Sequence, residues 1–288
     1  MRRVVFLLFA TLLVAALAAG TVQAGQLRAA VGSTTSPDGV RIVYEVHGTA
    51  TTGLVFVHGW SCDRSYWSGQ LKPFSDRFTV VAMDLAGHGE SGLGRTTQSM
   101  SAFGDDVAAV VEKIDLRRVV LIGHSMGGDV VLEAARRLKE RVAGLIWVDT
   151  YKDLSHLSTP EQIQAFAAKF RGNFSETTRS FVRSMFPPTA DKALVERIAS
   201  DMASAPENVA IPALEAAFAY AHEVPAVLKA LQLPLVAINP GTPPTNVENL
   251  RSHGVDAVLM PGVGHFLMME DPATFNRLLE DVLAKMVK

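Results

Sequence analysis

The feature that most constrains the fold is an alternation of short apolar runs with amphipathic segments. The runs are mostly continuous in their apolar character, as strands buried on both faces are: VRIVYEVHG, GLVFVHG, FTVVAMD, VVLIGHS, VAGLIWVD, LPLVAIN and DAVLMPG. Helix-like stretches such as SAFGDDVAAVVEKID and MGGDVVLEAARRLK lie between them. This order predicts an α/β fold in which helices cover both faces of a mostly parallel central sheet.

One segment departs from this alternation. Residues 151–231 show only helical patterning, with a helix start at Pro160 and a break at Pro187. We therefore expect a helical cap at 151–231, inserted into a single core formed by residues 25–150 and 232–288. Extra helices packed on one flank of the sheet would give the same pattern.

The first residues have the parts of a secretory signal peptide. Arg2 and Arg3 precede a long apolar run, and small residues lead up to Ala24. We expect cleavage after Ala24, which makes residues 1–24 a signal peptide and the mature protein periplasmic or secreted, with no stable membrane insertion. Because the apolar run nearly reaches the length of a membrane span, an uncleaved anchor is the alternative.

Composition excludes several partners and cofactors. The formal net charge is −2 with no basic run, which argues against a nucleic-acid partner. Cys62 is the single cysteine, so no intrachain disulfide can form, and we interpret it as a packing residue rather than a nucleophile. No metal-ligand spacing and no dinucleotide-binding glycine motif occurs, so neither a metal nor a cofactor is expected.

The stretch VVLIGHSMGGDVVLEAA has the spacing of a nucleophile on a sharp turn. Gly123, Ser125 and Gly127 form G-x-S-x-G between an apolar strand and a helix. The strained turn lies at the carboxyl end of the sheet, where open α/β sheets place their sites, and points the serine hydroxyl outward from it. The helix that follows directs its N-terminal dipole at developing negative charge. This context indicates a nucleophilic serine.

Two further motifs fit the same chemistry. HGW follows an apolar strand, and the backbone N–H of Trp60, together with that of Met126, is placed to hold an oxyanion. His265 lies in the glycine-rich MPGVGHF, after the last strand and before the final helix, where a catalytic base follows its serine in chain order. In MDLAGHGES we assign Asp84 a structural role within its loop.

Together HGW, D-x-x-G-x-G-x-S, GHSMGG and GHF resemble the α/β-hydrolase superfamily of serine hydrolases, over nearly all of the chain after residue 24. The resemblance implies the α/β-hydrolase fold, with Ser125 as nucleophile, His265 as base, and Trp60 and Met126 as oxyanion donors. The dehalogenase and epoxide hydrolase branches of the superfamily use aspartate where this chain has Ser125.

The acid partner of His265 is not where the superfamily usually has it. The loop after Leu235–Asn239 carries no carboxylate before Glu248. The preceding strand ends at Asp149, and in the superfamily's sheet order it lies beside the strand leading to the serine, about 4.8 Å away. We therefore predict Asp149 as the acid, with Glu248 and Asp153 as alternatives.

These residues predict hydrolysis of a carboxylic ester or lactone through an acyl-enzyme on Ser125, with a small, apolar substrate. Other reactions on the same residues, such as amide cleavage, carbon–carbon hydrolysis or perhydrolysis, are the alternative. A protein that binds a ligand in the same pocket without catalysis is a second alternative, because fold alone does not determine function.

Overall fold

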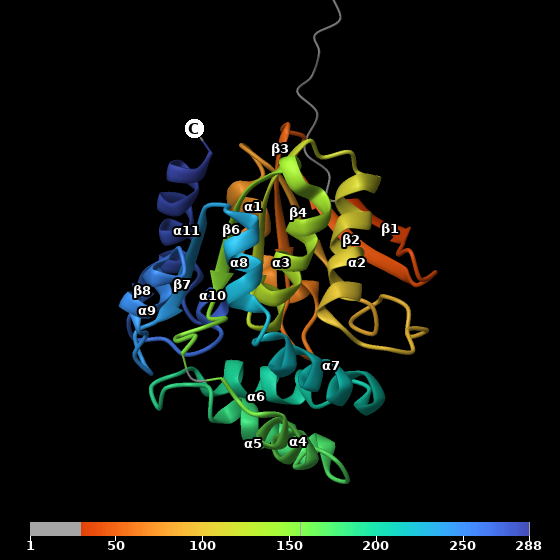
Figure 1. Cartoon of the computed structure of the whole chain (residues 1–288), viewed down its shortest axis with the longest axis vertical. Helices are drawn as coiled ribbons and strands as arrows, with labels where there is room; N and C mark the ends of the chain where they lie inside the picture. The colour runs from red at the N-terminus through yellow and green to blue at the C-terminus, as the bar shows by residue number, and fades with distance from the viewer. Residues whose placement is uncertain (1–29, 156, 288) are drawn as a thin grey trace, which may run out of the picture.

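The computed structural model describes residues 30–155 and 157–287, and the expected signal peptide lies outside this range. An eight-stranded sheet in the order β1-β2-β4-β3-β5-β6-β7-β8 forms the centre of the molecule (Figure 1). The strands are β1 (Ala30–Thr35), β2 (Arg41–His47), β3 (Thr52–Val57), β4 (Thr79–Met83), β5 (Arg118–His124), β6 (Val142–Val148), β7 (Leu235–Pro240) and β8 (Val255–Met260). The pairs from β4 to β8 are parallel, which confirms the predicted sheet.

β1 and β2 are the antiparallel part of the sheet. The sequence analysis did not anticipate β1, whose segment AVGSTT is largely exposed and has little apolar character. It pairs with β2 alone, and Gly32 lies against the ring of Tyr44, where a Cβ atom would come 2.8 Å from the ring. β1 is therefore an edge strand specified by its neighbour rather than by its own hydrophobicity.

Helices cover both faces of the sheet. The helices outside the inserted segment are α1 (Ser68–Phe74), α2 (Met100–Lys113), α3 (Met126–Leu138), α9 (Val247–Ser252), α10 (Leu267–Glu270) and α11 (Pro272–Met286), with 3-10 helices η1 (Arg64–Trp67) and η2 (Lys139–Arg141). α2 and α3 pack together in front of the strands in Figure 1, whereas α1, α10 and α11 form a second group. The central strands are consequently buried on both sides, with Val55 and Phe56 of β3 fully inaccessible.

The segment between β6 and β7 is helical throughout its regular structure. It contains α4 (Pro160–Ala168), α5 (Phe174–Arg183), α6 (Lys192–Met202), α7 (Glu207–Tyr220) and α8 (Val224–Leu231). α4 to α7 lie together beyond one end of the sheet (Figure 1), and we call these four helices the cap. α8 instead packs against α3 beside the sheet, so it belongs spatially with the core helices.

Sequence signals explain where the cap helices start. Thr159 and Gln162 form a capping box at α4, and Pro160 occupies the first turn, where its missing N–H costs nothing. Asp191 accepts a hydrogen bond from the backbone N–H of Leu194 at the start of α6. The cap helices are thus delimited locally, and their apolar sides supply the surface that faces the core.

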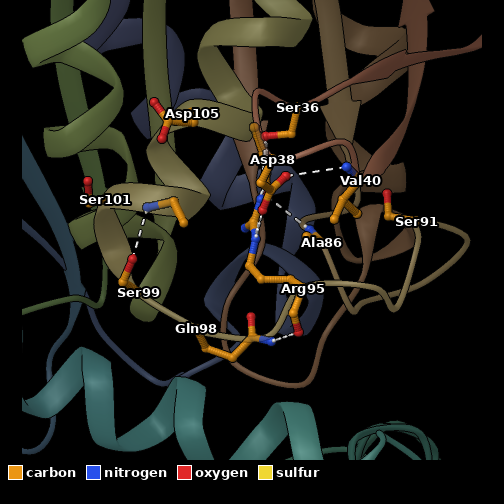
Figure 2. A network of polar contacts seen from close by, with 12 residues as sticks. Ser36, Asp38, Val40, Ala86, Ser91, Arg95, Gln98, Ser99, Ser101 and Asp105 are labelled. Carbon is orange, nitrogen blue, oxygen red and sulfur yellow. Dashed lines mark hydrogen bonds and ion pairs between the residues drawn. The ribbon is translucent and has the colours of Figure 1, made fainter.

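A buried ion network fixes the loop that follows β4 to the rest of the core (Figure 2). Arg95 donates to both carboxylate oxygens of Asp106 on α2, at 2.6 and 2.9 Å, and to Asp38 at 2.7 Å. Asp106 also accepts from the hydroxyl group of Ser36 and from the backbone N–H of Ala86. One carboxylate therefore joins the turn after β1, the loop after β4 and helix α2.

Candidate active site

Ser125 occupies a strained turn between β5 and α3. Its φ is 52° and its ψ is −122°, a backbone conformation that non-glycine residues rarely adopt. A Cβ atom on Gly123 would lie 2.1 Å from the carbonyl oxygen of Gly127, and one on Gly127 would lie 2.5 Å from that of Val57. Both glycines are therefore required for the turn to close against the end of β3.

Asp149 and His265 meet beside this turn. His265 Nδ1 lies 2.6 Å from Asp149 Oδ2, although the two residues are 116 positions apart in the chain. The Asp149 side chain is only 2% exposed and that of His265 is 19% exposed. Ser125, Asp149 and His265 line one cavity, so the structure brings together the three residues selected from the sequence.

Lys152 is a second partner of Asp149 that the sequence analysis missed. Its Nζ lies 2.5 Å from Asp149 Oδ1, so each carboxylate oxygen has its own donor. Burial acts to raise the pKa of Asp149, but the hydrogen bonds and charges of His265 and Lys152 outweigh it and hold that pKa below its ordinary value. Asp149 is therefore ionised at neutral pH. A lysine three residues after a strand-end aspartate was the available signal.

The alternative acids lie elsewhere. Glu248 is exposed in the first turn of α9. Asp153 lines the same cavity, but its carboxylate accepts from Ser155 and from Asn246 Nδ2, which ties it to its own loop region. At the end of β7, Asn239 donates to the backbone oxygen of Tyr151 and so stabilises the loop after Asp149.

Trp60 and Met126 both line the cavity next to Ser125. Gly59 makes this possible, because a Cβ atom there would lie 3.2 Å from that of Ser125. The backbone N–H of Leu85 donates to Nε2 of His58, so the proton of this imidazole is on Nδ1, which donates to the oxygen of Gly59. Burial lowers the pKa of His58 to about 4, which keeps it neutral in this supporting position.

The backbone around His265 is held from three sides. His124 Nε2 donates to the carbonyl oxygen of His265 at 2.9 Å. The backbone N–H of His265 donates to the carbonyl oxygen of Met185, just after α5. Glu270 accepts from the N–H groups of Gly264 and Phe266, one residue on each side of His265. Sequence reasoning missed Glu270, since only the folded loop turns these two amides toward it.

The cavity lies between the core and the cap and has a volume of about 480 Å³. Its cap side is apolar and consists of Phe181, Met185, Met202, Leu214, Ala217 and Phe218. Trp60 joins the two parts, because its indole N–H donates to the oxygen of Ala210 on α7 and its ring packs edge-on against Phe170. Phe170 itself is 1% exposed, so this aromatic residue belongs to the cap core.

Cys62 also lines the cavity and is buried. Burial raises the pKa of its thiol well above the ordinary value, and the thiol donates to the backbone oxygen of Trp60. These features describe a neutral packing group. Within residues 30–155 and 157–287, no cluster of three metal-ligating side chains is found, and no helix is long and apolar enough to cross a membrane.

Fold, motifs and cavity define a class of α/β enzymes, and comparison with known proteins identifies it. Residues 54–278 match the model of the alpha/beta hydrolase family, and the chain belongs to this family. The chain is 35% identical over 157 residues to a non-heme chloroperoxidase of Streptomyces lividans, over 50% of this chain and 57% of that protein. The chain spans between 30% and 57% of the length of the first two curated relatives it matches.

Solved structures of similar fold cover almost the whole chain. A thermophilic esterase from Thermogutta terrifontis superposes with a TM-score of 0.74 at 24% identity, over 92% of this chain and all of that one. Est816, described as an N-acyl homoserine lactone degrading enzyme, superposes with a TM-score of 0.72 at 25% identity, over 86% of this chain and 98% of that one.

Proposed function

We propose that this protein is a serine hydrolase that cleaves a carboxylic ester or a lactone through an acyl-enzyme on Ser125. The observation that carries the proposal is the hydrogen bond from His265 Nδ1 to the buried carboxylate of Asp149, at the wall of the cavity that Ser125 also lines from its strained turn. Membership of the alpha/beta hydrolase family supports the same reaction class.

In the first half-reaction, Ser125 Oγ attacks the carbonyl carbon of the substrate while His265 Nε2 takes the hydroxyl proton. The tetrahedral intermediate collapses, the carbon–oxygen bond to the alcohol breaks, and His265 returns the proton to the leaving oxygen. Asp149 holds Nδ1 of the ring protonated and stabilises the imidazolium that forms between these steps.

In the second half-reaction, water attacks the acyl-enzyme. His265 takes a proton from the water and gives it to Ser125 Oγ as the acid leaves, which regenerates the starting state. The negative oxygen of both intermediates is held by two backbone N–H groups, that of Trp60 in the loop after β3 and that of Met126 at the N-terminus of α3.

The walls of the cavity support an apolar substrate of small to medium size. The cap contributes Phe181, Met185 and Phe218 to a space of about 480 Å³, within the usual range for small-molecule sites. The similarity to Est816, whose description names a lactone substrate, supports including lactones in the substrate class.

We also propose that the mature protein is periplasmic or secreted and begins at Gly25, on the basis of the sequence of residues 1–24. Intact-mass measurement of protein recovered from a bacterial host tests this. A membrane-bound species that retains residues 1–24 would contradict it.

A fluorophosphonate probe and p-nitrophenyl esters test the reaction together. The wild-type protein should be labelled and should release p-nitrophenol, and Ser125→Ala should lose both, with a fall in rate on the order of 10⁴-fold or more. Undiminished turnover by folded Ser125→Ala protein would end the nucleophile assignment. A wild-type protein that neither reacts with the probe nor hydrolyses any ester in the panel would refute the proposed function.

A further inference from the structure

The mechanism leaves one buried carboxyl group in the cavity unused. Asp129 lies in the first turn of α3, four residues after Ser125, and is only 3% exposed. It lines the same cavity as Ser125. Within the described part of the chain, the one hydrogen bond to its carboxyl group comes from the Tyr151 hydroxyl, which donates to Oδ1 at 2.8 Å. Oδ2 therefore has no protein partner there.

A second polar group beside Asp129 is also unsatisfied. Thr150 lines the cavity, and its Oγ1 is buried without a hydrogen-bond partner among the described residues. A Cβ atom on Gly128 would lie 2.1 Å from this oxygen, so the hydroxyl group lies directly against the backbone next to Asp129. This oxygen is enclosed by protein rather than open to the cavity, so Asp129 Oδ2 is the polar atom of the two that a ligand can reach.

Asp129 is in its neutral form at pH 7. Burial raises the pKa of Asp129 to about 8, against the opposing effect of the hydrogen bond from Tyr151. A neutral carboxyl group carries one O–H donor, and Oδ1 already accepts from Tyr151. The proton on Oδ2 therefore needs an acceptor, which the ligand has to provide.

The neighbouring titratable groups leave this state undisturbed. Tyr220 on α7 interacts with Asp129, but its hydroxyl donates to Glu133 at 2.7 Å. The charge of Glu133 is balanced by two arginines of α3. Apart from Tyr151, the other titratable side chains of the cavity are Asp149, Lys152, Asp153, His265, Cys62 and His124, and burial lowers the pKa of His124 so that it is neutral. Asp149 and Lys152 form an ion pair with each other, so no unbalanced cation faces Asp129 from that pair.

We propose that Asp129 binds an uncharged oxygen acceptor on the acyl chain of the substrate, so that oxo-, alkoxy- or hydroxy-substituted acyl groups are preferred over plain alkanoyl groups. This rests on the proposed function, because the acyl chain is held on Ser125. A carboxylate on the substrate is disfavoured, since the neutral Asp129 and the apolar cap wall offer it no charge.

The helix geometry sets where the substituent must lie. Asp129 is four residues along α3 from Ser125, which corresponds to a rise of about 6 Å. An acyl chain that leaves Ser125 Oγ and follows the helix brings about its fifth carbon to Asp129. A ketone at this carbon is the sharpest probe, because a ketone oxygen only accepts hydrogen bonds and does not cyclise onto the ester as a hydroxyl group would.

The experiment compares kcat/KM for p-nitrophenyl 5-oxohexanoate and p-nitrophenyl hexanoate over a range of pH. The ratio of the two values cancels the pH dependence of the chemical step that both esters share. The wild-type protein should prefer the oxo ester about tenfold at pH 7, the effect of one hydrogen bond to an otherwise unsatisfied buried group. The ratio should fall as the pH rises through about 8, because the ionised carboxylate of Asp129 no longer donates.

Three variants distinguish hydrogen bonding from shape. Asp129→Asn keeps a donor without a titrating group, so its ratio should stay high and become independent of pH. Asp129→Leu removes the donor at similar volume, and its ratio should fall to near one. Thr150→Val is the control at the same wall: it should leave the ratio within about twofold of wild type, because the shape is retained and the enclosed hydroxyl group does not reach the ligand. If Asp129→Leu does not fold, the contrast between wild type and Asp129→Asn across pH is sufficient.

The outcomes separate this inference from the proposed function. Good turnover of both esters with a ratio near one at every pH overturns the inference and leaves the hydrolase assignment intact. The same holds for an elevated ratio that does not change with pH in the wild type or that persists in Asp129→Leu. If the wild-type protein hydrolyses neither ester and is not labelled by a fluorophosphonate, the proposed function fails, and this inference fails with it.

Discussion

Replacing Asp149 by asparagine should abolish most of the activity, for a reason specific to this site. Lys152 carries only donors, and it lies 2.5 Å from one oxygen of Asp149. In Asp149→Asn the amide oxygen must therefore face Lys152, and the amide NH₂ group must face His265. An NH₂ group donates to Nδ1, so the ring proton moves to Nε2. In this tautomer His265 does not accept the proton of Ser125.

The expected loss is large because water does not replace the carboxylate. The Asp149 side chain is 2% exposed, and its bond to His265 is 2.6 Å long. Loss of the correct tautomer and of the buried charge together lower kcat by about 10⁴-fold in triads of this type. That factor corresponds to about 5.5 kcal/mol of transition-state stabilisation.

The assay is the rate of p-nitrophenol release in single turnover, which reports acylation. Glu248→Gln is the matched control, since it makes the same chemical change at an exposed position on α9 and should change the rate by less than about twofold. A near-normal rate for Asp149→Asn, or a large loss for Glu248→Gln, would refute Asp149 as the acid.

A second substitution tests the orientation of the amide itself. In Asp149→Asn with Lys152→Met, no lysine fixes the amide, so its oxygen is free to turn toward His265 and restore the productive tautomer. A neutral acceptor is about half as effective as a charged one. The double variant should therefore recover about tenfold of the lost rate, equivalent to about 1.4 kcal/mol. Equal rates for the double variant and Asp149→Asn would show that Lys152 does not set the orientation.

Three further predictions concern stability and packing. Asp106→Ala should lower the free energy of unfolding in urea by about 3–5 kcal/mol, because it removes the carboxylate that takes two donors of the buried Arg95 guanidinium group and leaves only the partly exposed Asp38 as a counter-charge; a loss below about 1 kcal/mol would contradict this. Burial holds the pKa of His58 at about 4 and that of His124 at about 3, so below pH 6.5 the unfolded chain binds more protons than the folded one. Stability should then fall between pH 6.5 and 5 by up to about 1.4 kcal/mol per pH unit for each histidine, and a flat urea series over this range would exclude the effect. Cys62→Ala should keep ester hydrolysis within a few-fold of wild type, and complete inactivation of the folded variant would place the thiol in the mechanism.

The sequence was sufficient for the parts of the fold that depend on local pattern. β3, β4 and β5 are continuously apolar and buried, so their character is visible without a structure. The turn at Ser125 was predictable because only glycines allow its close contacts. β1 was not predicted, because an edge strand that pairs with one neighbour needs little hydrophobicity.

The sequence does not show which side chains contact one another across the cavity. Asp129 and Glu270 are acidic residues at unremarkable spacings, and they acquire importance only from what the fold places beside them. Asp129 in particular is on a helix whose pattern reads as amphipathic, where a charged residue is usually solvated. Burial of that position under Tyr151 depends on the loop after β6, which the sequence does not specify.

The position of the acid follows from the register of three neighbouring strands. His124 on β5 pairs with Val148 on β6, and Val148 pairs with Ile238 on β7. The next residues, Ser125, Asp149 and Asn239, therefore stand at one level across the sheet. Moving the acid from β7 to β6 shifts it by one strand spacing, about 4.8 Å, without changing its height. A histidine presented by the loop after β8 can meet a carboxylate at either position, and in this chain the asparagine on β7 instead holds the loop that follows Asp149.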